Sequence, residues 1–120
     1  MSKDLKAQLD AIAKGEQLSE EDLDNVAGGT HAQNIVLFSW IGKIDMSEIE
    51  FIHKTVDSDS PDAEWAFSTA VQGATNRILK KHGIDAEVIA SESGDNTYLY
   101  KGSFVSHKKF VGVLKQCIPS

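Results

Sequence analysis

The chain has 120 residues, 41% of them hydrophobic and 25% charged, which is the composition of one globular domain with a modest core. The formal net charge of −6 is uneven: residues 1–29 hold three lysines against seven acidic residues, and residues 30–120 hold nine basic against eleven acidic ones. A C-terminal part so close to neutrality lacks the basic field that favours nucleic acid or anionic membranes, and no run of about 18 apolar residues indicates a membrane span.

Residues 1–27 predict a helix, a break near Gly15 and a shorter helix. Ser2 can cap the first helix, and no positively charged segment leads into an apolar core, so a conventional secretory signal is not expected. Because short isolated helices are marginal in water, the narrow apolar stripes predict flexible helices that order on a partner. Docking onto the following domain is the alternative, and Gly28–Gln33 is expected to be a linker.

The second of these helices is acidic and amphipathic and ends at a pair of glycines. Ser19 can cap it, with Asp22 at the third position of the capping box. Gly28 and Gly29 end the helix and leave backbone without side chains, which can thread a narrow protease cleft. The apolar face of the helix consists of Leu18, Leu23 and Val26.

This segment resembles the double-glycine leader peptides of bacteriocins and related peptides, which peptidase-containing ABC transporters export. The resemblance covers residues 1–29 and implies that a cysteine peptidase domain on the transporter reads the face of Leu18, Leu23 and Val26. It also implies cleavage after Gly29, which releases the 91 residues Thr30–Ser120. An ordinary helical hairpin ending in a Gly-Gly turn is the alternative. The positions that match the LSxxELxxVxGG pattern are Leu18, Ser19, Leu23, Val26, Gly28 and Gly29, while Asp22 stands where the family usually has Glu.

The stretch Asn34–Ile41 has a different pattern. It is a nearly continuous run of β-branched, aromatic and other apolar residues, interrupted only by Ser39. Such a run predicts a core strand covered on both faces. Gly42 and Lys43 are expected to turn the chain.

Two helices are predicted next. Asp45 and Glu48 form a helix-start signature, which is followed by apolar residues at helical spacing up to Val56. All boundary rules agree on the second helix: Ser60 can cap it, Pro61 suits its first position, and the basic residues before Gly83 suit its last turn. Its expected buried stripe is Phe67, Ala70, Val71, Ala74 and Ile78, with Trp65 and Leu79 on the flanks.

The C-terminal part predicts two strands and a helix. Ile84–Ala90 is the second expected strand and, after a turn at residues 93–96, Thr97–Val105 is the third, in which Gly102 indicates a bulge or a close approach. Ser106 can cap a helix with Phe110, Val113, Leu114 and Cys117 on one face.

The expected fold class is therefore α+β: a small three-stranded sheet with helices on one face, in the order β-α-α-β-β-α, preceded by the flexible helical leader. We expect two parts, the double-glycine-type leader 1–29 and a small mature domain 30–120.

Residues that could carry chemistry are few. His31, His53, His82 and His107 lack the close spacing of a metal site, and we expect neither a metal ion nor a cofactor. Cys117 lies on an apolar stripe, which favours a small buried hydrophobe over a reactive or conjugated thiol, and as the single cysteine it forms no intrachain disulfide.

Two further clusters allow alternative interpretations. The acidic cluster at residues 57–64 could hold calcium, but it lacks the glycine-centred loop and distal glutamate of an EF-hand, so a solvated turn and helix cap are favoured. The hairpin around Lys101 has aromatic residues at alternate positions, Tyr98, Tyr100 and Phe104, which fits a binding face or simple packing. No phosphate loop, nucleophile elbow or carboxylate pair with a clear role is present in the sequence, so an enzyme is not expected.

These observations predict a bacterial, bacteriocin-like or signalling precursor that is cytoplasmic before processing and secreted after it. Its mature part is expected to act by binding an unidentified protein partner. Two alternatives stay open. The leader could instead guide enzymes that modify the side chains of a natural-product precursor, or the chain could be a cytoplasmic interaction or immunity-type module.

Overall fold

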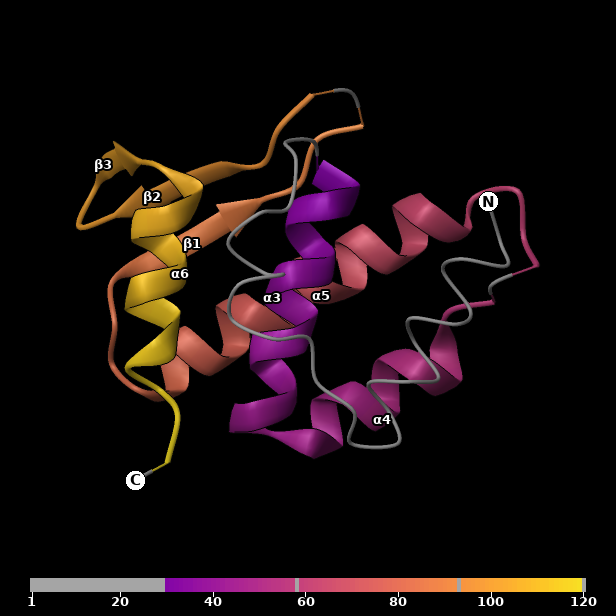
Figure 1. Ribbon diagram of the computed structural model, residues 1–120, viewed down its shortest axis with the longest axis horizontal. Helices are drawn as coiled ribbons and strands as arrows, with labels where there is room; N and C mark the ends of the chain where they lie inside the picture. The colour runs from indigo at the N-terminus through magenta and orange to yellow at the C-terminus, as the bar shows by residue number, and fades with distance from the viewer. Residues whose placement is uncertain (1–29, 58, 93, 120) are drawn as a thin grey trace.

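The computed structural model describes residues 30–57, 59–92 and 94–119, with side chains from Gln33 onward (Figure 1). Its elements in chain order are α3 (Thr30–Ile44), α4 (Met46–Thr55), α5 (Ala63–Lys81), β1 (Ala86–Ile89), β2 (Thr97–Tyr100), β3 (Ser103–Val105) and α6 (His107–Lys115). The described part of the chain is therefore α+β, as expected, with four helices and one antiparallel sheet of strand order β1-β2-β3. The predicted order β-α-α-β-β-α is wrong, because the elements follow each other as α-α-α-β-β-β-α.

The run Asn34–Ile41, predicted as a core strand, is the middle of α3. Every residue from Gln33 to Ile41 is buried, because α3 packs against α5, α4 and α6. A helix covered on all sides needs no polar face, so its sequence lacks the 3.6-residue period that would have marked it. A short apolar run without that period fits a buried strand and a buried helix equally well. The linker predicted up to Gln33 is also wrong from Thr30 onward, since α3 begins there.

The two helices predicted after this run are confirmed. Asp45 caps α4, since its side chain accepts a hydrogen bond from the backbone N–H of Ser47. In α5 the predicted stripe is buried except for half-buried Ala70, but Leu79, expected on the flank, is fully buried. Helix α5 begins at Ala63, so Ser60 and Pro61 precede it, with the Ser60 hydroxyl accepting from the backbone N–H of Asp62.

The sheet is a meander whose second hairpin was not predicted. The stretch Thr97–Val105, expected as one strand, is split into β2 and β3 by a turn at Lys101 and Gly102, both of which have positive φ (54° and 81°). Such a two-residue turn matches the natural twist of the flanking strands. A Cβ on Gly102 would meet nothing within 4 Å, so its role is the positive φ and not the close approach or bulge that we expected.

One face of the sheet is buried and the other is exposed. Val88 of β1 and Tyr98 of β2 are directly paired and buried, with α5 packed on β1 and α6 on β2. The side chains of Ile89 and Phe104 are exposed. None of the described helices combines the length and apolar character needed to cross a bilayer.

The core joins α3 to every other helix. The rings of Phe38 (α3) and Phe67 (α5) meet edge to face, with centroids 5.2 Å apart. The ammonium groups of Lys43 and Lys115 each lie 4.4 Å from the centroid of the buried Trp40 ring, which links α3 to α6. Helix α6 is capped by Ser106 as predicted and buries Phe110, Val113 and Leu114 of its expected stripe. Cys117, the fourth residue of that stripe, is also buried but lies in the turn after the helix.

Candidate functional site

The first described helix begins at the residue that follows the glycine pair. Helix α3 starts at Thr30, and the predicted cleavage site at Gly28 and Gly29 immediately precedes it. The glycine pair and the predicted recognition residues Leu18, Leu23 and Val26 all lie outside the described residues. The structure therefore bears on this site only through what it shows of the start of α3.

A buried polar network holds this start of α3 against the loop between β1 and β2. The backbone N–H of Asn96 donates to Oε1 of Gln33 (2.7 Å), and Nδ2 of Asn96 donates to Oδ1 of Asn34 (2.8 Å). Figure 1 shows the N-terminal end of α3 beside this loop. All three side chains are buried, with exposed fractions of 8% or less. We call Gln33, Asn34 and Asn96 the α3 clasp.

The network continues from the clasp to α6. Nδ2 of Asn96 also donates to the Tyr98 hydroxyl (3.2 Å), and that hydroxyl lies 2.5 Å from Nδ1 of His107. Because the Tyr98 oxygen already accepts from Asn96, its own proton is best directed to an unprotonated Nδ1, as in a neutral imidazole. Burial lowers the pKa of His107, against an opposing effect of Asp95, and burial raises the pKa of Tyr98. Both pKa shifts favour the neutral forms of His107 and Tyr98.

The clasp is not fully satisfied. Nδ2 of Asn34 and Oδ1 of Asn96 are buried without a hydrogen-bond partner. Unsatisfied buried polar atoms cost free energy, and they are rare enough in native proteins to invite an explanation. A clasp with one unpaired donor and one unpaired acceptor is weaker than its hydrogen bonds alone suggest.

A second set of amides closes the free edge of β1. Asn76 of α5 donates from Nδ2 to the Val88 carbonyl (3.0 Å) and accepts at Oδ1 from the Val88 N–H (2.9 Å). Gln72, one turn earlier, accepts at Oε1 from the N–H of Ala90 (2.7 Å). These side chains imitate a neighbouring strand and cover an edge that could otherwise pair with another chain.

Strand β3 of the second hairpin carries the most exposed large hydrophobic residue of the described chain. Phe104 is 80% exposed. The ammonium groups of Lys101 and Lys109 lie 5.3 and 5.6 Å from the ring centroid of half-buried Tyr100. Of the aromatic residues considered for a binding face, Tyr98 instead points into the core. Phe104 pairs with Leu99, and Ile89 pairs with Thr97, so both exposed side chains lie on the sheet face opposite Tyr98 and Tyr100. We call Phe104 and Ile89 the hairpin surface.

Charge is separated along the molecule. Residues 45–64 hold seven acidic residues and one lysine, whereas residues 96–120 hold four lysines and no acidic residue. In Figure 1 the hairpin and α6 lie at the left, and α4 with its connection to α5 lies at the right. The near-neutral sum of the mature part thus hides an acidic end and a basic end. At physiological salt, charges separated by more than about 8 Å are largely screened, so the two ends act locally.

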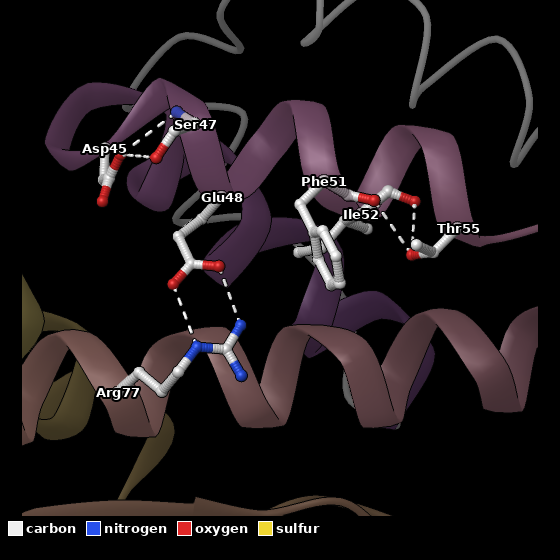
Figure 2. A network of polar contacts seen from close by, with 7 residues as sticks. All are labelled: Asp45, Ser47, Glu48, Phe51, Ile52, Thr55 and Arg77. Atoms are coloured by element: carbon white, nitrogen blue, oxygen red, sulfur yellow. Dashed lines mark hydrogen bonds and ion pairs between the residues drawn. The ribbon is translucent and has the colours of Figure 1, made fainter.

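An ion pair joins helices α4 and α5. Figure 2 shows Arg77 reaching from α5 to Glu48 of α4, where Nε and Nη2 donate to the two carboxylate oxygens at 3.0 and 2.7 Å. Phe51 lies one turn further along α4 and is 58% exposed. The pair is bidentate, which is typical of structural Arg–carboxylate contacts. It gives no indication of catalysis.

The other candidate groups stay apart. His53, His82 and His107 belong to three different elements, and in the described ranges no group of three metal-binding side chains converges. In the acidic cluster, Asp57 accepts from the backbone N–H of Asp59, as in a turn. Cys117 is buried, and burial raises the pKa of its thiol, which disfavours the nucleophilic thiolate.

A shallow cavity of ≈ 490 Å³ lies between the end of α5 and the β1–β2 hairpin. Its wall includes Lys80, Asp85 and Glu87, together with Asn76, whose amide is already committed to β1. The cavity contains no nucleophile paired with a base, so it offers no arrangement for covalent catalysis. Comparisons with protein-family models, with curated proteins and with solved structures find no match for this chain.

Proposed function

We propose that the chain is the precursor of a secreted bacteriocin-like or signalling protein. Its leader, residues 1–29, is cut after Gly29 by a peptidase-containing ABC transporter, and residues 30–120 then act by binding a partner. The observation that carries this proposal is the coincidence of two boundaries: the LSxxELxxVxGG pattern ends at Gly29, and α3 begins at Thr30. A cut between them leaves every described element whole.

The proposed cut precedes the first side chain that the structure describes, so the described core falls within the product. Its buried apolar residues run from Ile35 to Cys117, and its clasp begins at Gln33. A product that starts at Thr30 therefore retains all of these groups. We further propose that the hairpin surface is where the product meets its partner, because exposed phenylalanine and isoleucine side chains on one face of the sheet suit an apolar patch of another protein.

Leader-guided modification is less well supported. A modifying enzyme needs an accessible side chain, and Cys117, the single cysteine, is buried with a raised thiol pKa. Mass shifts at Cys, Ser or Thr side chains of the isolated product would favour this alternative. A C-terminal epitope found only inside the cells would favour the cytoplasmic module.

The test is mass spectrometry of the culture medium and of the cells that make the protein. We expect the medium to contain a product whose N-terminus is Thr30. Replacement of Gly29 with valine should abolish this product, because a branched side chain does not fit a cleft shaped for glycine. The matched control is Gly15→Val, which changes a leader glycine away from the cut.

Recognition by the leader face is tested in the same assay. Alanine at Leu18, Leu23 and Val26 together should prevent processing, whereas alanine at Glu20 and Glu21, on the acidic face of the same helix, should have little effect. The proposal is overturned by recovery of only intact Met1–Ser120 inside cells, or by normal trimming of the Gly29→Val chain.

A further inference from the structure

The bond that the peptidase is proposed to cut adjoins a helix. Thr30, the residue after the bond, is the first residue of α3, and the residues that follow it are helical. A narrow protease cleft takes extended backbone, so the first turn of α3 has to unwind before the chain can lie in the cleft. Local unwinding of this kind has a free energy set by the contacts that the segment loses.

Unwinding of the first turn of α3 would break the clasp. Release of Gln33 and Asn34 breaks their hydrogen bonds to the backbone and side chain of Asn96, and it exposes two side chains that are 8% and 0% exposed in the fold. Ile35 and Val36 follow directly and belong to the core. The N-terminal turn of α3 is therefore tied down at a point only a few residues after the proposed cut.

Both described hydrogen bonds of the clasp are donated by Asn96. Its backbone binds Gln33, its side chain binds Asn34, and it lies 62 residues or more from both in the sequence. The clasp can close only when the β1–β2 loop has reached its place beside α3. A chain that has not yet folded has no clasp, although it already contains the whole leader.

We infer that the α3 clasp controls when the leader can be removed: the folded precursor resists cleavage after Gly29, and the unfolded chain is cut readily. This inference rests on the proposed function and adds the order of events, in which cleavage comes before the clasp closes. The two unpaired amide atoms of Asn34 and Asn96 keep the clasp weak enough to open. A folded precursor is therefore cut slowly and not blocked completely.

The test compares two asparagine-to-alanine variants of the full chain. Asn96→Ala removes the side-chain half of the clasp. Asn76→Ala is the matched control, because it removes an amide that makes two hydrogen bonds to the Val88 backbone of β1 instead of to the clasp. The first readout is amide hydrogen exchange at residues 33–37, and the second is the rate of cleavage after Gly29 by a double-glycine peptidase domain.

We expect Asn96→Ala to raise both rates about tenfold, the effect of losing one or two buried hydrogen bonds, and Asn76→Ala to change them less than about twofold. A synthetic peptide of residues 10–40, which lacks Asn96, should be cut faster than either full chain. If Asn96→Ala does not fold, Gln33→Ala removes one hydrogen bond and serves in its place.

Two outcomes overturn the inference: exchange at residues 33–37 that is unchanged in Asn96→Ala, or equal acceleration by Asn76→Ala, which would indicate general loosening of the fold. Failure of the proposed function looks different. In that case the peptidase leaves the peptide of residues 10–40 intact, whatever the exchange rates of the full chain are.

Discussion

At the scale of single residues, the polar groups of the interior are the most informative. Hydrogen bonds connect Asn96, Tyr98 and His107, whereas the hydroxyl of Ser39 and the indole N–H of Trp40 are buried without partners. Connected polar groups stabilise one arrangement, and unpaired ones reduce stability. Two predictions follow from this contrast.

Stability should fall when the pH is lowered through the titration range of His107. Burial places the folded-state pKa of His107 below its unfolded value of about 6.5, so the unfolded chain binds more protons as the pH falls. The His107 contribution is therefore fully present above about pH 6.5 and is lost below it. Urea unfolding between about pH 7.5 and 5 measures this change. His107→Gln should flatten the profile, and His82→Gln, which removes an exposed imidazole, is the control.

Ser39→Ala should stabilise the fold. Ser39 is fully buried in α3 and its hydroxyl has no partner, so alanine removes an unsatisfied group and adds helix propensity. We expect a gain of about 1 kcal/mol in the free energy of unfolding. Ser47→Ala is the contrasting variant, because the Ser47 hydroxyl donates to Asp45, and it should not stabilise. A loss of stability in Ser39→Ala would mean that the hydroxyl has a partner in solution.

At the scale of elements, boundaries are decided by short-range chemistry. Asp45 and Ser106 accept hydrogen bonds from the first turns of α4 and α6, and Gly102 supplies the positive φ of the hairpin turn. A glycine inside a helix has no such role. Gly73 lies in the middle of α5, where glycine lowers helix stability.

Gly73→Ala should therefore stabilise α5. A Cβ at this position would meet Nη1 of Arg77 at 3.2 Å, which is the end of a flexible side chain whose Nε and Nη2 hold Glu48. The guanidinium can shift slightly, so most of the propensity gain of about 1 kcal/mol should remain. Thermal unfolding checks this. Gly102→Ala should do the opposite, since its φ of 81° disfavours any Cβ. Destabilisation by Gly73→Ala would show that the ion pair cannot adjust.

At the scale of the whole molecule, α3 is the centre and the hairpin surface is the periphery. Helices α4, α5 and α6 all contact α3, and the sheet is held through α5 and α6. The exposed Phe104 is not part of this core. Phe110 of α6 is fully buried, and its ring centroid lies 4.7 Å from that of Tyr98. Two phenylalanines close in sequence thus have opposite roles.

Phe110→Ala should cost about 3–5 kcal/mol, a large part of the stability of a small domain, whereas Phe104→Ala should change it by less than about 0.5 kcal/mol. Urea unfolding of the two variants measures the difference. A large loss in Phe104→Ala would mean that its side chain is covered in solution, and it would remove the hairpin surface as a place for a partner.

The features that could be predicted from the sequence are those decided by residues close together in the chain. The sequence by itself determined α4, α5 and α6 and the presence of strands at β1 and β2, because caps, prolines, glycines and amphipathic stripes act within a few residues. It also contains the leader pattern, which the described structure neither adds to nor changes. These signals were sufficient for the α+β class.

Only the tertiary structure decided the nature of Asn34–Ile41 and the existence of the clasp. The run is a helix that packs against α4, α5 and α6, and nothing within the run records those neighbours. Gln33 and Asn34 meet a residue more than 60 positions away, so no local pattern marks their pairing with Asn96. Burial on all sides and pairing across long distances are properties of the folded chain, since both depend on segments that come together only in space.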